Sequence, residues 1–298
     1  GIETTFGVTP FREAILYDDS GREWRYQSSA PLFYMVRRGT GTGMLDIGLK
    51  QQAIDAGVTI RFNQRFPQTP NQPHVIATGP RGSFAIVVGY IFKTSLPDMV
   101  LGALSDRLAP RGYAYFVTSG GVGTIASCLF ADLPHYQRYL ANTVRFFEQR
   151  TGVTLETPRR FGGTGNVRVE RSARAGEGLL VGEAAGFQDA LWGFGLRYAM
   201  LSGHFAARAL MNGNAAEYDP LWRNRFAGHI KTSFVNRFFY ERLGDKGYRA
   251  FLARLGKSHD ARDWLRSHYA PSTWKSLMYR LVRRHYRGAR SESPRLPG

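Results

Sequence analysis

The sequence predicts a mixed α/β fold that combines a small α/β part, an antiparallel sheet and a helical C-terminal region. Residues 178–210 read as a short apolar strand, a glycine turn and a long stretch with apolar residues at helical spacing. Residues 84–130 contain repeated runs of aromatic and β-branched residues, which favour strands. From residue 219 onward, apolar residues again follow the period of an amphipathic helix.

The composition is that of a globular protein without internal disulfides. At 298 residues and 43% hydrophobic content, the chain can bury a sizeable core. Its one cysteine, Cys128, lies in an apolar run, which predicts a buried packing residue. No apolar run is long enough to span a membrane, and the first residues do not resemble a secretory signal. These features predict a cytoplasmic protein.

The net charge of +17 is concentrated near the C-terminus. From Pro220 onward there are 18 Lys and Arg residues against 5 Asp and Glu residues. Basic regions of this kind attract phosphate-bearing partners, and we expect an anionic membrane surface rather than a specific nucleic acid. Peripheral attachment to the inner face of the membrane would follow. A solvated surface on a protein of high pI is the alternative.

The stretch after residue 178 offers a site for a flat ligand. Glu183 supplies a carboxylate that can hold a hydroxyl, and the small residues beside it leave no bulk to obstruct a ring. Gly193 and Gly195 precede a helical run that begins at Leu196, so helix N-terminal amides would face an electron-rich ligand atom. An ordinary strand, turn and helix with glycines for close packing is the alternative.

The segment GEAAGFQDALWGFGLRYAMLSG resembles the flavin-contacting motif of FAD-dependent oxidoreductases of the geranylgeranyl reductase family. That family is related to the para-hydroxybenzoate-hydroxylase type of flavoprotein. The resemblance implies that Glu183 bonds the ribityl chain and that the amides around Gly193 and Gly195 lie near the flavin ring. Glu replaces the usual Asp, and the loop lacks a common proline. The cofactor-binding residues implied here are Gly182, Glu183, Ala184, Ala185, Gly186, Gly193, Gly195 and Leu196.

The first thirty residues predict a hairpin, with strands at residues 14–17 and 23–26 joined by a turn of Asp, Ser and Gly. Flavoproteins of this type begin with a strand, a G-x-G-x-x-G turn and a helix that hold the ADP half of FAD. Nothing in residues 1–30 has that form. We therefore expect the first βαβ unit to be missing from this chain, and FAD to bind weakly or not at all.

Residues 34–58 resemble a second family segment, in which an arginine precedes a helix. The predicted helix starts near Leu45, and Gly57 is expected to end it in the left-handed conformation. In the family this arginine approaches the cofactor. Arg38 is the nearer match here, and Arg37 is the alternative. Ile60-Arg61-Phe62 then predicts a strand.

Four strands are predicted in the antiparallel sheet, at residues 84–88, 90–92, 112–117 and 123–129. Residues 109–116 resemble the family's P-x-G-Y-x-W-x-F segment, with Tyr115 at the usual tryptophan. Alternation places Tyr113 and Tyr115 on one face, where with Trp192 they would line an apolar substrate pocket. Plain core packing is the alternative. An amphipathic helix is predicted over residues 133–150, with Gly152 as its cap.

The C-terminal region predicts helices in which aromatics and leucines alternate with cations, most clearly at residues 274–284. Such a helix suits an anionic membrane surface, and packing with a basic outer face is the alternative. Residues 291–298 are expected to be disordered. The predicted parts are substrate-domain strands at 1–30, a partial FAD-binding domain at 31–82, an antiparallel-sheet substrate domain at 83–160, the flavin-motif part of the FAD-binding domain at 161–215 and a basic helical region at 216–298.

The resemblance implies an FAD-dependent oxidoreductase that reduces carbon–carbon double bonds of an isoprenoid or other lipid-like substrate. NAD(P)H or another donor would supply the electrons. The cofactor carries the chemistry in such enzymes, and no metal site is predicted. Two other interpretations stay open, namely a flavin monooxygenase and a non-catalytic basic module that binds membranes or nucleic acid.

Overall fold

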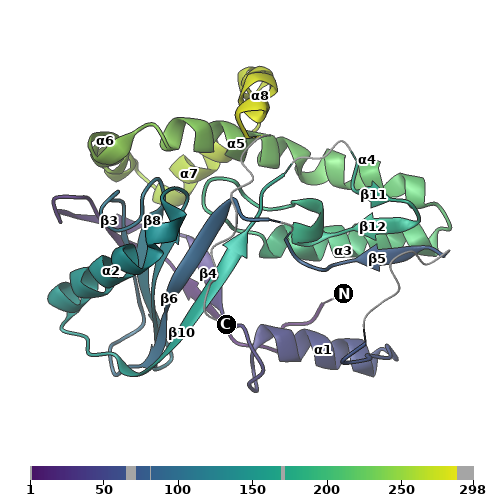
Figure 1. Ribbon diagram of the computed structural model, residues 1–298, viewed down its shortest axis with the longest axis horizontal. Coiled ribbons are helices and arrows are strands. Elements are labelled where there is room, and N and C mark those ends of the chain that lie inside the picture. Colours follow the sequence, from purple (N-terminus) through teal and green to yellow (C-terminus); the bar gives the residue numbers. More distant parts are fainter. Residues whose placement is uncertain (1, 65–71, 81, 169–171, 287–298) are drawn as a thin grey trace.

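A seven-stranded sheet is the largest element of the fold (Figure 1). The computed structural model describes residues 2–64, 72–80, 82–168 and 172–286. The strand order in this sheet is β10-β6-β9-β8-β7-β2-β3. The strands are β2 (Glu13–Tyr17), β3 (Glu23–Gln27), β6 (Ala85–Lys93), β7 (Met99–Ala103), β8 (Tyr113–Ser119), β9 (Val122–Leu129) and β10 (Glu156–Gly165).

The predicted hairpin is confirmed as the pair β2 and β3, and its turn contains Gly21 with a φ of +84°. The sheet is antiparallel as expected, except that β2 pairs with β7 in parallel. The two strands expected at residues 84–92 are one strand, β6, because Gly89 lets the backbone of β9 lie directly against it. A Cβ at Gly89 would lie 2.3 Å from the Ile125 carbonyl oxygen. Strand β7 was not predicted.

Helix α2 (Tyr136–Thr151) packs on one face of this sheet. Its buried Phe146 and Phe147 rings contact each other edge to face. The centre of the Phe147 ring lies 5.9 Å from the centre of the Phe116 ring of β8. A short 3₁₀ turn, Leu133–His135, precedes the helix. Gly152 ends it with a φ of +65°, so the predicted helix and its cap are confirmed.

The turn before β8 brings two strands unusually close. A Cβ at Gly112 would lie 1.8 Å from the carbonyl oxygen of Cys128, so only glycine fits there. Cys128 is buried, as expected, and burial raises the pKa of its thiol to about 11. The thiol therefore stays protonated, in keeping with a packing role.

A second sheet carries the predicted flavin motif. Its strands are β11 (Arg174–Ala175), β12 (Gly178–Leu180) and β5 (His74–Ile76), and β12 pairs with β5 in parallel. Helix α3 (Leu196–Met211) follows and packs beside this sheet. The predicted strand at the start of the motif and the long helix after it are both confirmed.

The segment before β5 differs from expectation in one element. Strands β1 (Val8–Phe11) and β4 (Phe33–Val36) pair with each other, and α1 (Leu45–Asp55) ends at Gly57 with a φ of +83°, as predicted. The strand predicted at Ile60-Arg61-Phe62 is wrong. These residues pair with no other described strand, and Phe62 is 70% exposed. An isolated extended run without a partner does not form a sheet.

The C-terminal region is helical, as predicted, and lies along the upper side of the molecule in Figure 1. The predicted disordered tail at residues 291–298 falls outside the described residues. No helix in the described part of the chain is both long and apolar enough to cross a membrane. The elements are α4 (Tyr218–Trp222), a π-helical turn (Arg223–Ala227), α5 (Gly228–Tyr240), α6 (Gly244–Gly256), α7 (Ala261–Tyr269) and α8 (Thr273–Tyr286).

Candidate functional site

The bend between β12 and α3 is built from small residues that face the interior. One 3₁₀ turn begins at Gly182, and Gly186 ends it with a φ of +71°. Ala184 and Ala185 are only 2% and 0% exposed. The N–H of Gly182 donates to the Ser202 hydroxyl of α3 at 2.9 Å. The bend is therefore fixed on α3, and its two alanine side chains belong to the core.

Two of the motif glycines serve close packing. A Cβ at Gly186 would lie 2.7 Å from the carbonyl oxygen of Arg168. A Cβ at Gly182 would lie 3.2 Å from that of Ala199. At Gly182 and Gly186, close packing alone explains why the residue is glycine, and no ligand is needed to explain it.

The other end of the loop, from Gly193 to Gly195, is open. Gly193 has a φ of +78°, and a Cβ there would have no atom within 4 Å. A Cβ at Gly195 would meet the Gln188 side chain at 3.5 Å. Among the described residues, the N–H groups of Gly195, Leu196 and Arg197 have no hydrogen-bond partner. The start of α3 therefore presents free donors and the positive end of its dipole to a ligand.

Glu183 and Gln188 form a polar pair inside the bend. Glu183 is half-buried, and this burial raises the pKa of its carboxyl group, while a hydrogen bond from Gln188 lowers it. The Gln188 amide nitrogen also donates to the carbonyl oxygen of Gly193 at 2.8 Å. Gln188 thus links the predicted ribityl-binding carboxylate to the open glycine backbone. Gln188 was not among the cofactor-binding residues predicted from the motif.

Asp189 shapes the loop between the two glycine clusters. Its Oδ1 accepts hydrogen bonds from the N–H groups of Leu191 and Trp192 and from the Tyr269 hydroxyl, at 3.0, 2.6 and 3.2 Å. Asp189 was not among the predicted site residues. An aspartate whose side chain accepts from the backbone two and three residues later is a local turn signal, and it could have been recognised. Burial raises the pKa of Asp189 to about 6.

Replacing Asp189 with asparagine is expected to flatten the pH dependence of stability between pH 4 and pH 7. The folded-state pKa of about 6 exceeds the ordinary aspartate pKa of 3.8, so the folded protein binds this proton more tightly than the unfolded chain does. The wild type should therefore lose up to about 3 kcal/mol as pH rises through this window. The amide oxygen of asparagine can keep the three hydrogen bonds. Urea unfolding of both proteins across the window measures the difference.

Asp260→Asn is the control for this experiment. Backbone and serine hydrogen bonds lower the pKa of Asp260 to about 2, so this carboxylate is ionised in the folded protein throughout the window. The free energy of unfolding of this variant should run parallel to the wild type from pH 5 to pH 7. A wild-type curve parallel to that of Asp189→Asn would contradict the raised pKa of Asp189.

Arg38, the arginine predicted to approach the cofactor, contacts α1 and not the bend between β12 and α3. Arg38 forms a forked ion pair with Asp46 of α1, with two contacts of 2.8 Å, and this hydrogen bonding raises the guanidinium pKa. The neighbouring Arg37 donates to the carbonyl oxygens of Ser119 and Gly120 in the turn between β8 and β9. Arg37 therefore ties this segment to the large sheet, while the Arg38 side chain is 64% exposed.

The three predicted pocket residues lie together. The Tyr113 ring lies 6.1 Å from that of Tyr115 and 5.4 Å from that of Trp192. The Tyr113 hydroxyl donates to the carbonyl oxygen of Trp192 at 2.6 Å. Burial raises the pKa of both tyrosines, so both phenols stay neutral. The structure thus joins the aromatic face of β8 to the loop that carries the flavin motif.

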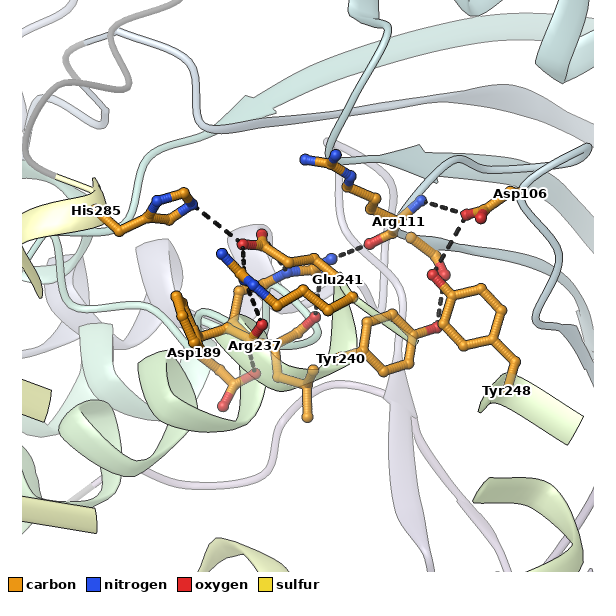
Figure 2. Close-up of polar contacts among 12 residues, drawn as sticks. Asp106, Arg111, Asp189, Arg237, Tyr240, Glu241, Tyr248 and His285 are labelled. Atoms are coloured by element: carbon orange, nitrogen blue, oxygen red, sulfur yellow. Dashed lines mark hydrogen bonds and ion pairs between the residues drawn. The ribbon is translucent and has the colours of Figure 1, made fainter. Parts of the chain in front are cut away.

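A buried arginine, Arg237 of α5, holds this loop against the large sheet (Figure 2). Its Nη1 donates to the carbonyl oxygen of Leu191 at 3.0 Å, and its Nη2 donates to that of Arg111. The guanidinium lies 3.9 Å from the centre of the Phe130 ring and 3.9 Å from the Glu241 carboxylate. Arg237 therefore connects the helical region, the sheet and the flavin-motif loop. The helical pattern around residue 237 predicts a helix face for Arg237 but no such connecting role.

A pocket of about 200 Å³ lies beside this arginine and is lined by Arg111, Glu241, Arg242 and His285. None of these residues was predicted as a site residue. Glu241 is paired with Arg242 at 2.7 Å and with His285 at 3.3 Å, as Figure 2 shows for the histidine. The pocket is therefore a charge-paired junction between α5 and α8.

No protein-family model and no curated protein sequence matches the chain. Solved structures match its fold. A geranylgeranyl bacteriochlorophyll reductase-like protein from Thermoplasma acidophilum is 17% identical, with a TM-score of 0.64 over 91% of this chain and 79% of that one. The flavin-dependent brominase Bmp2 is 15% identical, with a TM-score of 0.62 over 94% and 83% of the two chains.

A flavoprotein/dehydrogenase from Cytophaga hutchinsonii is 14% identical, with a TM-score of 0.54 over 94% of this chain and 84% of that one. Identities this low bear on the fold alone, because one fold hosts many reactions. The mixed α/β fold predicted from the sequence is confirmed. The chain has the mixed α/β fold of FAD-dependent oxidoreductases.

Proposed function

We propose that the chain is an FAD-dependent oxidoreductase. The flavin ring of FAD would bind at the open end of the bend between β12 and α3. The observation that carries this proposal is the bare backbone of Gly193 and Gly195, which leads into free N–H groups at the start of α3. A flat ring with electron-rich edge atoms fits such a surface. Glu183, half-buried beside it, would hold a ribityl hydroxyl.

The ADP half of the cofactor needs a different cradle. Within residues 2–64, 72–80, 82–168 and 172–286, no strand leads through a G-x-G-x-x-G turn into a helix. In this proposal the described residues would contact the flavin half of FAD, and none of them forms a cradle of this kind for the ADP half. We expect the flavin half to supply most of the affinity.

This expectation has a direct test in the quenching of flavin fluorescence. FAD, FMN and riboflavin should bind the purified chain with dissociation constants within about tenfold of one another, in the high-micromolar range. FAD that copurifies stoichiometrically, or binds about a hundredfold more tightly than riboflavin, would show that the chain holds the ADP half. Absence of quenching by all three flavins would contradict a flavin-binding bend.

The proposed reaction is reduction of a carbon–carbon double bond in an isoprenoid or other lipid-like substrate. The reduced flavin would supply a hydride to one carbon while the other carbon gains a proton, and NAD(P)H or another donor would reduce the flavin again. The protein's part would be to place the substrate and exclude water. Tyr113, Tyr115 and Trp192 support this proposal as a neutral aromatic wall next to the flavin-motif loop. A product that gains two hydrogens and no oxygen is the expected result.

A further inference from the structure

One outer surface of the helical region combines exposed apolar side chains with positive charge. The apolar residues are half or more exposed on α8, at 51% for Trp274, 56% for Leu277 and 63% for Leu281. Phe239 and Leu243, near the end of α5, are 46% and 39% exposed. We call these five residues the α8 face. Single exposed apolar residues are common, but a group on one surface indicates a binding site.

The helix geometry shows that this face points away from the core. Positions 274, 277 and 281 lie on one side of α8, because they are spaced by one and two helical turns. The opposite side buries Tyr279 and Val282, and Tyr279 packs against Phe234 of α5. The Trp274 ring lies 6.4 Å from the ring of Phe239, so the stripe on α8 continues onto α5.

The exposed charges that α8 itself carries are positive. Arg280 and Arg284 are exposed on the side of α8 next to the leucines, and α8 contains no acidic residue. The carboxylate of Glu241 lies nearby, but it is only 9% exposed and is paired with Arg242 and His285. The outward potential is therefore positive, in a chain whose net charge is +17.

We infer that the α8 face binds an anionic lipid bilayer, with α8 lying parallel to the membrane surface. Tryptophan and leucine would enter the boundary between headgroups and acyl chains, while the two arginines contact lipid phosphates. A second copy of the chain is disfavoured as the occupant, since a twofold contact would bring like charges together. This inference stands on the C-terminal helices alone and does not depend on flavin binding.

Cosedimentation of the full chain with lipid vesicles tests the inference. We expect binding to phosphatidylcholine vesicles that contain about one-third phosphatidylglycerol, little binding to phosphatidylcholine alone, and loss of binding at high salt. The double variant Leu277→Gln/Leu281→Gln and the double variant Arg280→Gln/Arg284→Gln should each weaken partitioning at least tenfold. The tryptophan emission of the wild type should shift to the blue on binding, and the variant Trp274→Phe should lose this shift.

Met211→Gln is the matched control, because Met211 is 87% exposed at the end of α3 and lies outside the α8 face. It should bind vesicles as the wild type does. Circular dichroism should show all variants folded, since the substituted side chains are exposed. Equal vesicle binding by the wild type and the leucine variant, or no binding by the wild type, would overturn the inference. Concentration-dependent dimerisation that the leucine variant abolishes, without vesicle binding, would identify a protein interface instead and would also overturn it.

Discussion

Replacing Arg237 with methionine is expected to lower the free energy of unfolding by about 3–5 kcal/mol. The guanidinium is fully buried and donates to the carbonyl oxygens of Leu191 and Arg111. Methionine fills much of the volume but leaves both carbonyls without their donor and the Glu241 carboxylate without this nearby positive charge. Unpaired buried polar groups are costly because neither water nor protein satisfies them. Urea unfolding at neutral pH measures the loss.

The matched control is Arg242→Met, which removes another arginine from the same carboxylate. Arg242 contacts Glu241 at 2.7 Å, but its side chain is 44% exposed. Water can replace most of that interaction, so the expected cost is below about 1 kcal/mol. Equal losses for the two variants would show that burial of Arg237 is not what matters. A loss below about 1 kcal/mol for Arg237→Met would contradict its connecting role.

The elements that sequence analysis predicted correctly depend on local chemistry. The β2–β3 hairpin follows from its turn residues, and the helix ends at Gly57 and Gly152 follow from the left-handed conformation that glycine tolerates. The strand and helix around the flavin motif follow from periodicity within one short stretch. In each case the residues that determine the structure are neighbours in the chain.

The elements that were missed or wrong depend on distant partners. Strand β7 is a short apolar run that pairs antiparallel with the next strand, β8, and in parallel with β2, which lies more than eighty residues earlier in the chain. The run Ile60-Arg61-Phe62 has strand-forming residues but no described strand beside it. Pairing across such separations leaves no signal in a single sequence.

In the candidate site, too, the features set by nearby residues were predicted and those set by distant partners were not. The open backbone at Gly193 and Gly195 was predicted from the motif, and the contact between Tyr113 and Trp192 was expected from their roles in one pocket. Arg237 could not have been found, because its partners lie 46 and 126 residues away. An arginine on a helix face ordinarily predicts a solvated residue.

Gly195→Val is expected to abolish most flavin binding while leaving the fold intact. The backbone at Gly195, with a φ of −120° and a ψ of −20°, is open to other residues, and an added Cβ would meet Gln188 at an ordinary 3.5 Å. The free energy of unfolding should change by less than about 1 kcal/mol. A branched side chain there would stand where the ring is proposed to rest, so flavin affinity should fall at least tenfold, or about 1.4 kcal/mol.

Gly203→Val is the matched control on the same helix. A Cβ at Gly203 has no atom within 4 Å, so valine fits there too, but this position lies about 12 Å along the helix from Gly195. Riboflavin titration of the wild type and both variants, followed by fluorescence quenching, is the most direct test of the proposed site. We predict that riboflavin binds the wild type and Gly203→Val alike and binds Gly195→Val at least tenfold more weakly. Equal affinities for all three proteins, or no binding to the wild type, would contradict a flavin ring at this bend.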